Sequence, residues 1–386
     1  MERTFSELGI DDDICAALAE RGISKAFPVQ SMTIPDILKG RDVCGKAKTG
    51  SGKTLAFGLP MVQLLERSQP GLPHGLILVP TRELAIQVRN ELVDAAHVKG
   101  VRLASIYGGD QIDKQIKALK SGVDIAVCTP GRAIDLIDRG DLSVTAVTHV
   151  VIDEADRMAD MGFLTQVEWI LRNVDSSAQT LLFSATLDGA VDALVRRYQT
   201  DPARHEVVSS TVTVEKMTHR FVAVHQMDRA KVAAKIISAS NRTMIFCNTK
   251  HWVDRLVDDL IGLDIRAQAI HGDLRQQNRE RALGAFKNGK LQALVATEVA
   301  ARGIHIDEVD TVIHYDPPQD HKSYLHRSGR TARAGEQGLV VSLVLWNQEL
   351  EVKRLQKRLG LDIPIVEMFS NDVRLDDLAA WDPNAG

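Results

Sequence analysis

The stretch that most constrains this chain is residues 47–54, which read AKTGSGKT and lie between a short apolar run and a longer one with helical character. A glycine loop between a strand and a helix is the setting of a phosphate-binding P-loop. Gly50 and Gly52 let the backbone curl so that successive N–H groups point at phosphate oxygens, and a helix starting near Lys53 adds its positive N-terminal end. Ala47 stands where the strict pattern has glycine. A plain glycine turn with a solvated Lys53 is the alternative interpretation.

If residues 47–54 are a P-loop, particular side chains have specific roles in binding and hydrolysing a nucleotide. The Lys53 ammonium reaches the terminal phosphates of a nucleotide, and the Thr54 hydroxyl ligates Mg²⁺. Further along, residues 150–156 read VVIDEAD, an apolar strand that ends in two carboxylates. Asp153 would hold Mg²⁺, and Glu154 would orient or deprotonate the attacking water. The alternative is an ordinary acidic helix start, where Asp and Glu are favourable.

Short β-branched runs alternate with helical patterns through the whole chain. They predict an α/β fold of parallel sheets covered by helices on both faces, because such strands are apolar throughout and are joined by helices. At 386 residues the chain is long enough for two such domains. The expected strands, besides the one before the P-loop, are 75–80, 102–107, 124–128, 149–152, 180–183, 220–224, 243–247, 266–270, 293–296, 311–315 and 339–345.

Polar residues gather where these strands end. Ligands of parallel α/β sheets bind outside the carboxyl ends of the strands, so these residues are candidates for a binding site. They lie at 80–82, 108–109, 129–132, 153–154, 184–186, 248–249 and 297–298.

A change of pattern near residues 202–216 divides the chain, because the strand–helix rhythm loosens there and resumes near His219. No residue-level repeat relates the two halves, although the rhythm recurs. We expect a first domain over residues 1–208, a linker over 209–216, a second domain over 217–372 and a short, partly ordered tail over 373–386.

The composition narrows the class of protein. The net charge of −4 gives no electrostatic sign of nucleic-acid binding, so any such binding must come from local clusters of basic groups. The four cysteines form no CxxC pair, and Cys44, Cys128 and Cys247 lie in apolar runs, which predicts buried thiols of a reducing compartment. No signal-peptide pattern and no membrane-spanning run are visible. We therefore expect a cytoplasmic protein.

Residues 153–156, which read DEAD, are the signature of the DEAD-box ATP-dependent RNA helicases, and the chain resembles this family from residue 5 to residue 335. The resemblance is specific because each motif follows the element expected of it. Two features most resemble the bacterial RhlE-like group of this family: Phe163 after Met161 and Gly162, and the ending near residue 370. The resemblance implies a monomer with two tandem RecA-like domains that bind ATP, Mg²⁺ and RNA.

For the nucleotide, the resemblance implies an adenine-reading motif upstream of the P-loop. Gln30 matches its glutamine, whose amide offers the donor and the acceptor that an adenine edge requires. Ala26 and Phe27 stand where the family usually has Pro and Thr. An ordinary helix-surface amide is the alternative for Gln30. The implied nucleotide-binding residues are Phe5, Ile23, Gln30, Thr49, Gly50, Ser51, Gly52, Lys53, Thr54, Asp153, Glu154, Gly303, His305, Arg330 and Arg333.

Residues 326–333, which read HRSGRTAR, resemble the arginine-finger motif of the family. At their spacing Arg330 and Arg333 share one face of a helix, from which both could meet the γ-phosphate as its charge spreads in the transition state. A solvated basic helix face is the alternative. The expected catalytic residues are Lys53, Glu154, Arg330 and Arg333.

Besides Ala26 and Phe27, two positions in the second half of the chain depart from the family pattern. The family usually has Asp at the position of His305, where the resemblance implies a contact with a ribose hydroxyl. Glu298 also stands where the family usually has Asp. A neutral imidazole has one donor and one acceptor, so we expect His305 to keep the ribose contact. A solvated loop histidine is the alternative.

The RNA contacts implied by the resemblance lie on loops suited to the sugar–phosphate backbone, with arginines, threonine hydroxyls and N–H groups of glycines or helix starts. Aromatic residues make up only 4% of the chain, so binding without base stacking and tolerant of sequence is expected. Helix capping is the alternative. The expected RNA-binding residues are Pro80, Thr81, Arg82, Gly108, Gly109, Thr129, Arg132, Thr249, Gly272, Arg279 and Thr297, and Ser184 and Thr186 are expected to couple hydrolysis to strand separation.

The resemblance therefore implies an RNA-stimulated ATPase that opens RNA duplexes locally and non-processively or remodels ribonucleoproteins. ATP and RNA would close the two domains, and hydrolysis would reopen them. An ATP-dependent RNA clamp and a DNA-translocating P-loop helicase are the alternatives. Comparing strand displacement with ATP and with a non-hydrolysable analogue tests the RNA-clamp alternative. Comparing the stimulation of ATPase activity by RNA and by DNA tests the DNA-helicase alternative.

Overall fold

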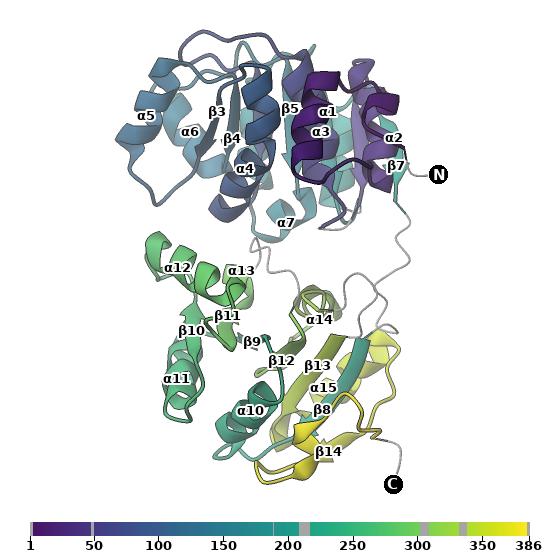
Figure 1. Cartoon of the computed structure of the whole chain (residues 1–386), viewed down its shortest axis with the longest axis vertical. Coiled ribbons are helices and arrows are strands. Elements are labelled where there is room, and N and C mark those ends of the chain that lie inside the picture. The colour runs from purple at the N-terminus through teal and green to yellow at the C-terminus, as the bar shows by residue number, and fades with distance from the viewer. Residues whose placement is uncertain are drawn as a thin grey trace. The chain divides into compact units, whose positions relative to one another are not determined.

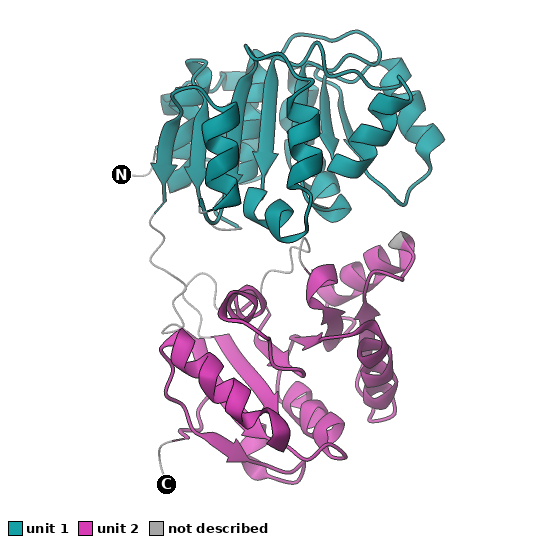
Figure 2. Ribbon diagram, turned by 180° about the vertical axis from the view of Figure 1, so that it is seen from behind, with its two compact units in different colours: residues 1–209 teal, residues 210–386 magenta. Residues whose placement is uncertain are grey.

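The computed structural model describes residues 3–47, 50–187, 189–207, 217–301, 309–331 and 338–383. Strands and helices alternate through both halves of the chain (Figure 1). They form two compact units, Met1–Ser209 (unit 1) and Ser210–Gly386 (unit 2), coloured teal and magenta in Figure 2. The expected linker, residues 209–216, lies outside the described residues.

Unit 1 is built on a seven-stranded sheet in the order β3-β4-β2-β5-β6-β1-β7, with every neighbouring pair parallel. Its central strands are buried along their whole length, because helices cover both faces and leave only apolar positions. The strands are β1 (Val43–Lys46), β2 (Gly75–Leu78), β3 (Leu103–Ile106), β4 (Ile125–Cys128), β5 (His149–Asp153), β6 (Gln179–Ser184) and β7 (Ala203–Glu206).

Two hydrophobic cores lie on the two faces of this sheet. One packs against the first four helices and the other against the next five. Pro28 at the first position of α2 suits a helix start, because its missing N–H would have no partner there. The helices are α1 (Asp12–Glu20), α2 (Pro28–Leu38), α3 (Lys53–Leu64) and α4 (Arg82–Val98), then α5 (Ile112–Ser121), α6 (Pro130–Asp138), α7 (Ala155–Asp160), α8 (Leu164–Leu171) and α9 (Ala190–Tyr198).

Unit 2 repeats this architecture with a parallel sheet in the order β10-β11-β9-β12-β13-β8-β14. Counted from the first strand of each unit, the two sheets have the same order, which explains why the rhythm recurs without a residue-level repeat. The strands are β8 (Met217–Ala223), β9 (Thr243–Cys247), β10 (Ala267–Ile270), β11 (Ala293–Thr297), β12 (Thr311–His314), β13 (Gly338–Val344) and β14 (Ile365–Glu367).

The helices of unit 2 also cover both faces of its sheet. α10 and α11 pack on one core, and α12 to α15 pack on the other. These helices are α10 (Arg229–Ser238), α11 (Lys250–Ile261), α12 (Gln276–Lys287), α13 (Glu298–Ala301), α14 (His321–Ser328) and α15 (Glu349–Leu359).

Residues 373–386, expected as a separate tail, contribute to the core of unit 2 as far as they are described. Leu375 and Leu378 are buried, and the Arg220 guanidinium lies 5.7 Å from the centre of the Trp381 ring. Apolar burial on the face of α10 therefore holds this end in place.

The α/β fold with two parallel sheets is confirmed, and so are the buried, free thiols of Cys44, Cys128 and Cys247. Two edge strands were not anticipated. β7 falls in the stretch expected to be irregular, and its Arg204 and Glu206 are exposed. Edge strands pair on one side only, so their sequences need not be apolar. Among the described helices none is long and apolar enough to cross a membrane.

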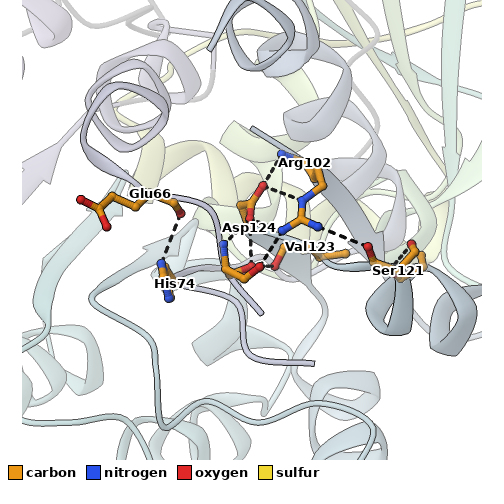
Figure 3. Close-up of polar contacts among 8 residues, drawn as sticks. Glu66, His74, Arg102, Ser121, Val123 and Asp124 are labelled. Carbon is orange, nitrogen blue, oxygen red and sulfur yellow. Dashed lines mark hydrogen bonds and ion pairs between the residues drawn. The ribbon is translucent and has the colours of Figure 1, made fainter. Parts of the chain in front are cut away.

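A buried ion pair ties together the loops at the amino edge of sheet 1 (Figure 3). Asp124, just before β4, accepts hydrogen bonds from Nε (2.9 Å) and Nη2 (2.7 Å) of Arg102 and from the N–H (2.6 Å) and hydroxyl (2.9 Å) of Ser68. Arg102 Nη1 also donates to Ser121 O at 3.2 Å. Burial raises the pKa of the Asp124 carboxyl, but the hydrogen bonds from Arg102 and Ser68 outweigh it and hold the pKa well below its usual range.

Replacing Asp124 by Asn should lower the free energy of unfolding of unit 1 by about 3 kcal/mol, the low end for breaking a buried ion pair, since 35% of the Arg102 side chain is exposed. Because the native pKa is lowered, this stabilisation is present above the unfolded-state value of about pH 4 and is lost as the pH falls toward the native value. Urea unfolding followed by hydrogen exchange of residues 102–128 measures both effects.

The matched control is Glu168→Gln on α8, which breaks the surface ion pairs of Glu168 with Arg172 and Arg197. It should cost less than about 1 kcal/mol. An Asp124→Asn chain as stable as the wild type at pH 7 would contradict the assignment.

Candidate functional site

The predicted P-loop lies between β1 and α3, at the carboxyl edge of sheet 1. Gly50 and Gly52 have φ angles of +80° and +84°, in the left-handed region that favours glycine. Ser51 between them is half-buried, and Thr49 lies outside the described residues. The loop therefore has the backbone conformation that lets N–H groups converge on an anion.

Lys53 opens α3, and its side chain is only 6% exposed. Its Nζ lies 3.7 Å from Asp153 Oδ1 and has no hydrogen-bond partner among the described residues. A buried ammonium has three protons to donate, so one distant carboxylate leaves it under-satisfied. The position fits a ligand with several anionic oxygens, such as a nucleotide phosphate.

Asp153 and Glu154 end β5, and both are buried. Burial raises the pKa of Asp153, and the Lys53 ammonium opposes that shift. Glu154 has a φ of +53°, a conformation that a non-glycine residue rarely adopts, and its N–H donates to Asp153 Oδ1 at 2.9 Å. The Arg157 guanidinium donates to Glu154 Oε2. Arg157 is not among the predicted site residues, although its position three residues after an acidic residue indicates such a pair on a helix.

Thr54, the predicted metal ligand, is buried in the first turn of α3. Burial raises the pKa of the Glu91 carboxyl on α4, and the Thr54 side chain opposes that shift. The described residues contain no group of three or more His, Cys, Asp or Glu side chains that could hold a metal.

Gln30 on α2 is 1% exposed and binds the P-loop directly. Its Nε2 donates to Gly52 O at 2.9 Å, and its Oε1 accepts from the Phe27 N–H at 2.7 Å. It is therefore not an ordinary helix-surface amide. Phe5 is 2% exposed in the core beneath α1 to α4, and Ile23 packs half-buried against the same core. Phe5 thus has no exposed face beside Gln30.

The two predicted coupling residues contact the last residue of the DEAD sequence. The Asp156 N–H donates to Ser184 Oγ at 3.1 Å, and the Thr186 N–H donates to Asp156 Oδ2 at 3.2 Å. The end of β6 is thereby connected to the start of α7. A shift of either segment has to break or move these bonds.

Three strand ends of unit 1 carry the predicted RNA residues. Pro80 and Thr81 follow β2, and Thr81 Oγ1 caps α4 by accepting from the Leu84 N–H at 3.3 Å. The Arg82 guanidinium packs over Gly109 after β3, where a Cβ would lie 2.5 Å from Nη1. Thr81 is thus a helix cap in this structure, and the loops after β2 and β3 are in contact.

The third of these strand ends follows β4. Thr129 comes directly before α6, and Arg132 lies in the first turn of that helix. Arg132 Nε is 3.5 Å from Asp135, while its buried Nη1 has no hydrogen-bond partner among the described residues. This unsatisfied donor at the carboxyl edge suits an anionic ligand.

The RNA residues predicted in unit 2 occupy corresponding positions. Thr249 caps α11 by accepting from the Trp252 N–H at 3.2 Å, and Thr297 is the last residue of β11. Gly272 follows β10 by one residue. Arg279 is 6% exposed, with Nη2 donating to Ala300 O at 3.3 Å. Its guanidinium is therefore bonded within its own unit.

Of the residues predicted to reach the nucleotide from unit 2, only Arg330 is described, half-buried directly after α14. Gly303, His305 and Arg333 lie outside the described residues.

Arg327, one turn before Arg330, is a buried hub that the sequence analysis did not single out. Its Nε donates to Glu298 Oε2 at 3.0 Å, its Nη1 to Asp316 O at 2.8 Å and its Nη2 to Asn248 Oδ1 at 3.2 Å. It thereby joins α14 to the ends of β9, β11 and β12. Glu298, the residue that departs from the family pattern, has a defined partner in this hub.

Comparison with known proteins identifies both halves of the chain. The family model described as DEAD/DEAH box helicase matches residues 27–194, and the model described as Helicase conserved C-terminal domain matches residues 228–335. The chain is 40% identical over 356 residues to the DEAD-box ATP-dependent RNA helicase CshA of Bacillus cereus, covering 92% of this chain and 68% of that protein. It is 42% identical over 343 residues to the protein of the same name from Geobacillus kaustophilus, covering 88% and 73%.

Solved structures agree with this similarity. S. cerevisiae Dbp5 bound to RNA and ADP BeF3 matches with a TM-score of 0.80 and 28% identity, over 96% of each chain. A DEAD box protein from the hyperthermophile Methanococcus jannaschii matches with a TM-score of 0.54 and 35% identity, over 95% of this chain and all of that one.

The contacts of Gln30 generate a prediction about the unliganded protein. Gln30→Ala leaves the Phe27 N–H and the Gly52 carbonyl without this partner, and should lower the free energy of unfolding of unit 1 by about 1–3 kcal/mol. Urea unfolding followed by hydrogen exchange of residues 28–64 is the measurement. Gln115→Ala is the matched comparison, because Gln115 clamps the backbone of Tyr107 in the same way.

Gln111→Ala, at an exposed position, should change the free energy of unfolding by less than about 0.5 kcal/mol. If Gln30→Ala were as neutral as Gln111→Ala, the two hydrogen bonds to the P-loop and to Phe27 would not stabilise the unit.

Proposed function

The chain belongs to the DEAD-box family of ATP-dependent RNA helicases, and we propose that its two units bind ATP and RNA jointly and use hydrolysis to open RNA duplexes locally or to remodel ribonucleoproteins. The observation that carries this proposal is the Lys53 ammonium, buried at a glycine loop 3.7 Å from Asp153 and without a hydrogen-bond partner among the described residues. A nucleotide phosphate supplies the acceptors that this ammonium lacks.

In unit 1, Lys53 holds the terminal phosphates, while Asp153 and Thr54 are the ligands of Mg²⁺. The cation, when bound with the nucleotide, neutralises charge on the phosphate oxygens. It takes only one or two protein ligands in such sites and keeps several waters. Glu154 orients or deprotonates the attacking water, and Arg157 fixes the carboxylate of Glu154 through the ion pair described above.

In unit 2, Arg330 and Arg333 supply positive charge to the γ-phosphate in the transition state. Gly303 and His305 contact the nucleotide from the same unit. The buried Arg327 network supports this proposal, because it fixes the end of α14 from which Arg330 follows. Neither unit is complete alone, so binding of both ligands favours closure, and hydrolysis followed by phosphate release favours reopening.

RNA is held through its backbone by the strand-end loops of both units. Support comes from Arg132, whose unsatisfied Nη1 lies at a carboxyl strand end, and from Arg82 beside Gly109. Phosphate contacts position the strand without reading its sequence. Such binding tolerates any sequence and weakens with added salt.

We further propose that the protein acts as a monomer in the cytoplasm. Its four free cysteines suit a reducing compartment.

The catalytic roles predict two different defects. Glu154→Gln should keep ATP and RNA binding while lowering the RNA-stimulated kcat by about 100-fold or more, because only the water-activating group is lost. Lys53→Ala should weaken ATP binding itself by about 10-fold or more, since charge-assisted hydrogen bonds to phosphate are lost. Steady-state ATPase assays with RNA and equilibrium ATP binding distinguish the two.

Lys120→Ala is the control for charge, because Lys120 is 70% exposed on α5. It should behave as the wild type in both assays. Normal turnover in Glu154→Gln would remove Glu154 from its assigned role.

The shared site predicts that residues 1–208 alone have almost no RNA-stimulated ATPase. An arginine finger supplies a factor of about 10³ or more, and Arg330 and Arg333 lie in unit 2. The measurement is ATP turnover with saturating RNA, with ATP binding to the fragment as the check that unit 1 is folded.

The same loss should follow in the full chain when Arg330 and Arg333 are both replaced by Ala. Full RNA-stimulated activity in residues 1–208 would show that unit 1 is sufficient.

A further inference from the structure

Phe27 is the most exposed aromatic side chain among the described residues of unit 1, at 56%. A ring of this size buries a large apolar area when it is packed, and Phe27 belongs to neither core of unit 1. Single exposed apolar residues are common on protein surfaces. Exposure alone therefore does not indicate a role for Phe27, whereas its position in the structure does.

That position is against the P-loop. A Cβ placed on Gly52 would lie 2.6 Å from Phe27 Cδ2 and 2.5 Å from Gln30 Nε2, so both side chains contact the same glycine. The Phe27 N–H donates to Gln30 Oε1 at 2.7 Å, and Gln30 Nε2 donates to Gly52 O at 2.9 Å. The ring is thus anchored beside the loop through its own backbone, with its outer surface left open.

Gln30 keeps part of its hydrogen-bonding capacity in this arrangement. A glutamine amide has two N–H donors and two acceptor lone pairs, and the bonds to Gly52 and Phe27 use one of each. One donor and one acceptor remain unused, and because Gln30 is only 1% exposed, a ligand edge reaches them only after neighbouring atoms move. Phe27 adds an exposed aromatic face next to this edge-reading group.

We propose that Phe27 is a stacking platform for the base of the bound nucleoside triphosphate. The inference rests on the proposed function, which places phosphates at the P-loop, and it deepens that function by naming the group that covers one face of the base. Aromatic stacking accepts any base because every base has a π-face, so selection of adenine is left to Gln30. Phe5, buried in the core, and the aliphatic Ile23 do not offer such a face.

The proposal also accounts for a departure in the sequence. Phe27 stands where the resemblance leads one to expect Thr, and Ala26 where it leads one to expect Pro. A hydroxyl at position 27 would supply no ring surface. This chain therefore has a means of holding the base that the usual residue lacks.

The experiment compares full-length variants in equilibrium binding with Mg²⁺ and without RNA. The probes are ATP, GTP and ribose 5′-triphosphate, which has phosphates and sugar but no base. Phe27→Ala should weaken ATP and GTP binding alike, by roughly 5-fold or more, and should leave ribose 5′-triphosphate binding within about two-fold. Phe27→Trp should restore the affinity for both nucleotides, and Phe27→Thr should behave as Phe27→Ala.

Two controls make the result specific. Trp169→Ala removes another exposed aromatic side chain of unit 1, on α8, and should leave all three affinities unchanged. Gln30→Ala should lower the preference for ATP over GTP, unlike Phe27→Ala.

Three outcomes would overturn the inference. Unchanged ATP affinity in Phe27→Ala, while Lys53→Ala still loses binding, would show that the ring does not touch the base and would leave the proposed function intact. Equal weakening of ribose 5′-triphosphate would show that the ring covers the phosphates. Absence of ATP binding by the wild-type chain would remove the proposed function together with the inference.

Discussion

Parallel pairing of the strands is the constraint on which the rest of this structure depends. In a sheet where every neighbouring pair is parallel, all carboxyl ends lie on one edge and all amino ends on the other. The helices must then run back across the faces, so the central strands become apolar and polar residues are displaced to their ends. The P-loop, the Asp153–Glu154 pair and the loops with Arg82 and Arg132 meet on one edge of unit 1 for this reason.

Buried charged side chains at the two edges of the sheet of unit 1 differ in how fully they are hydrogen-bonded. At the amino edge, the Asp124 carboxylate is satisfied by Arg102 and Ser68, so the ion pair ties loops together and leaves nothing for a ligand (Figure 3). At the carboxyl edge, Lys53 and Arg132 each keep a buried nitrogen without a hydrogen bond among the described residues. An unsatisfied buried donor is costly, and a ligand that supplies anionic oxygens removes that cost. Both edges therefore carry buried charge. They differ because the charged group at the amino edge has its hydrogen bonds, whereas Lys53 and Arg132 at the carboxyl edge each have a nitrogen that lacks one.

Unit 2 uses the same strand order with other side chains. Arg327 is one of the buried cations near the carboxyl edge, and its bonds to Glu298, Asn248 and the Asp316 carbonyl connect three strand ends to α14. Glu298 is one methylene longer than the Asp usual in the family, and it still meets this guanidinium at 3.0 Å. Glu298 therefore keeps a contact with Arg327 in spite of its greater length, because its flexible side chain can place the carboxylate against the rigid guanidinium.

The sequence by itself determined the two parallel sheets, the P-loop setting and the strand-end location of the polar residues, because apolar runs and glycine spacing are local signals. It did not reveal β7 or β14, since an edge strand needs no apolar pattern. Only the tertiary structure decided that Gln30 binds Gly52, and that Phe5 is buried while Phe27 is open. Those facts depend on how helices pack over the sheet. Packing brings together side chains that are distant in the chain, and no local pattern of residues encodes which of them will touch.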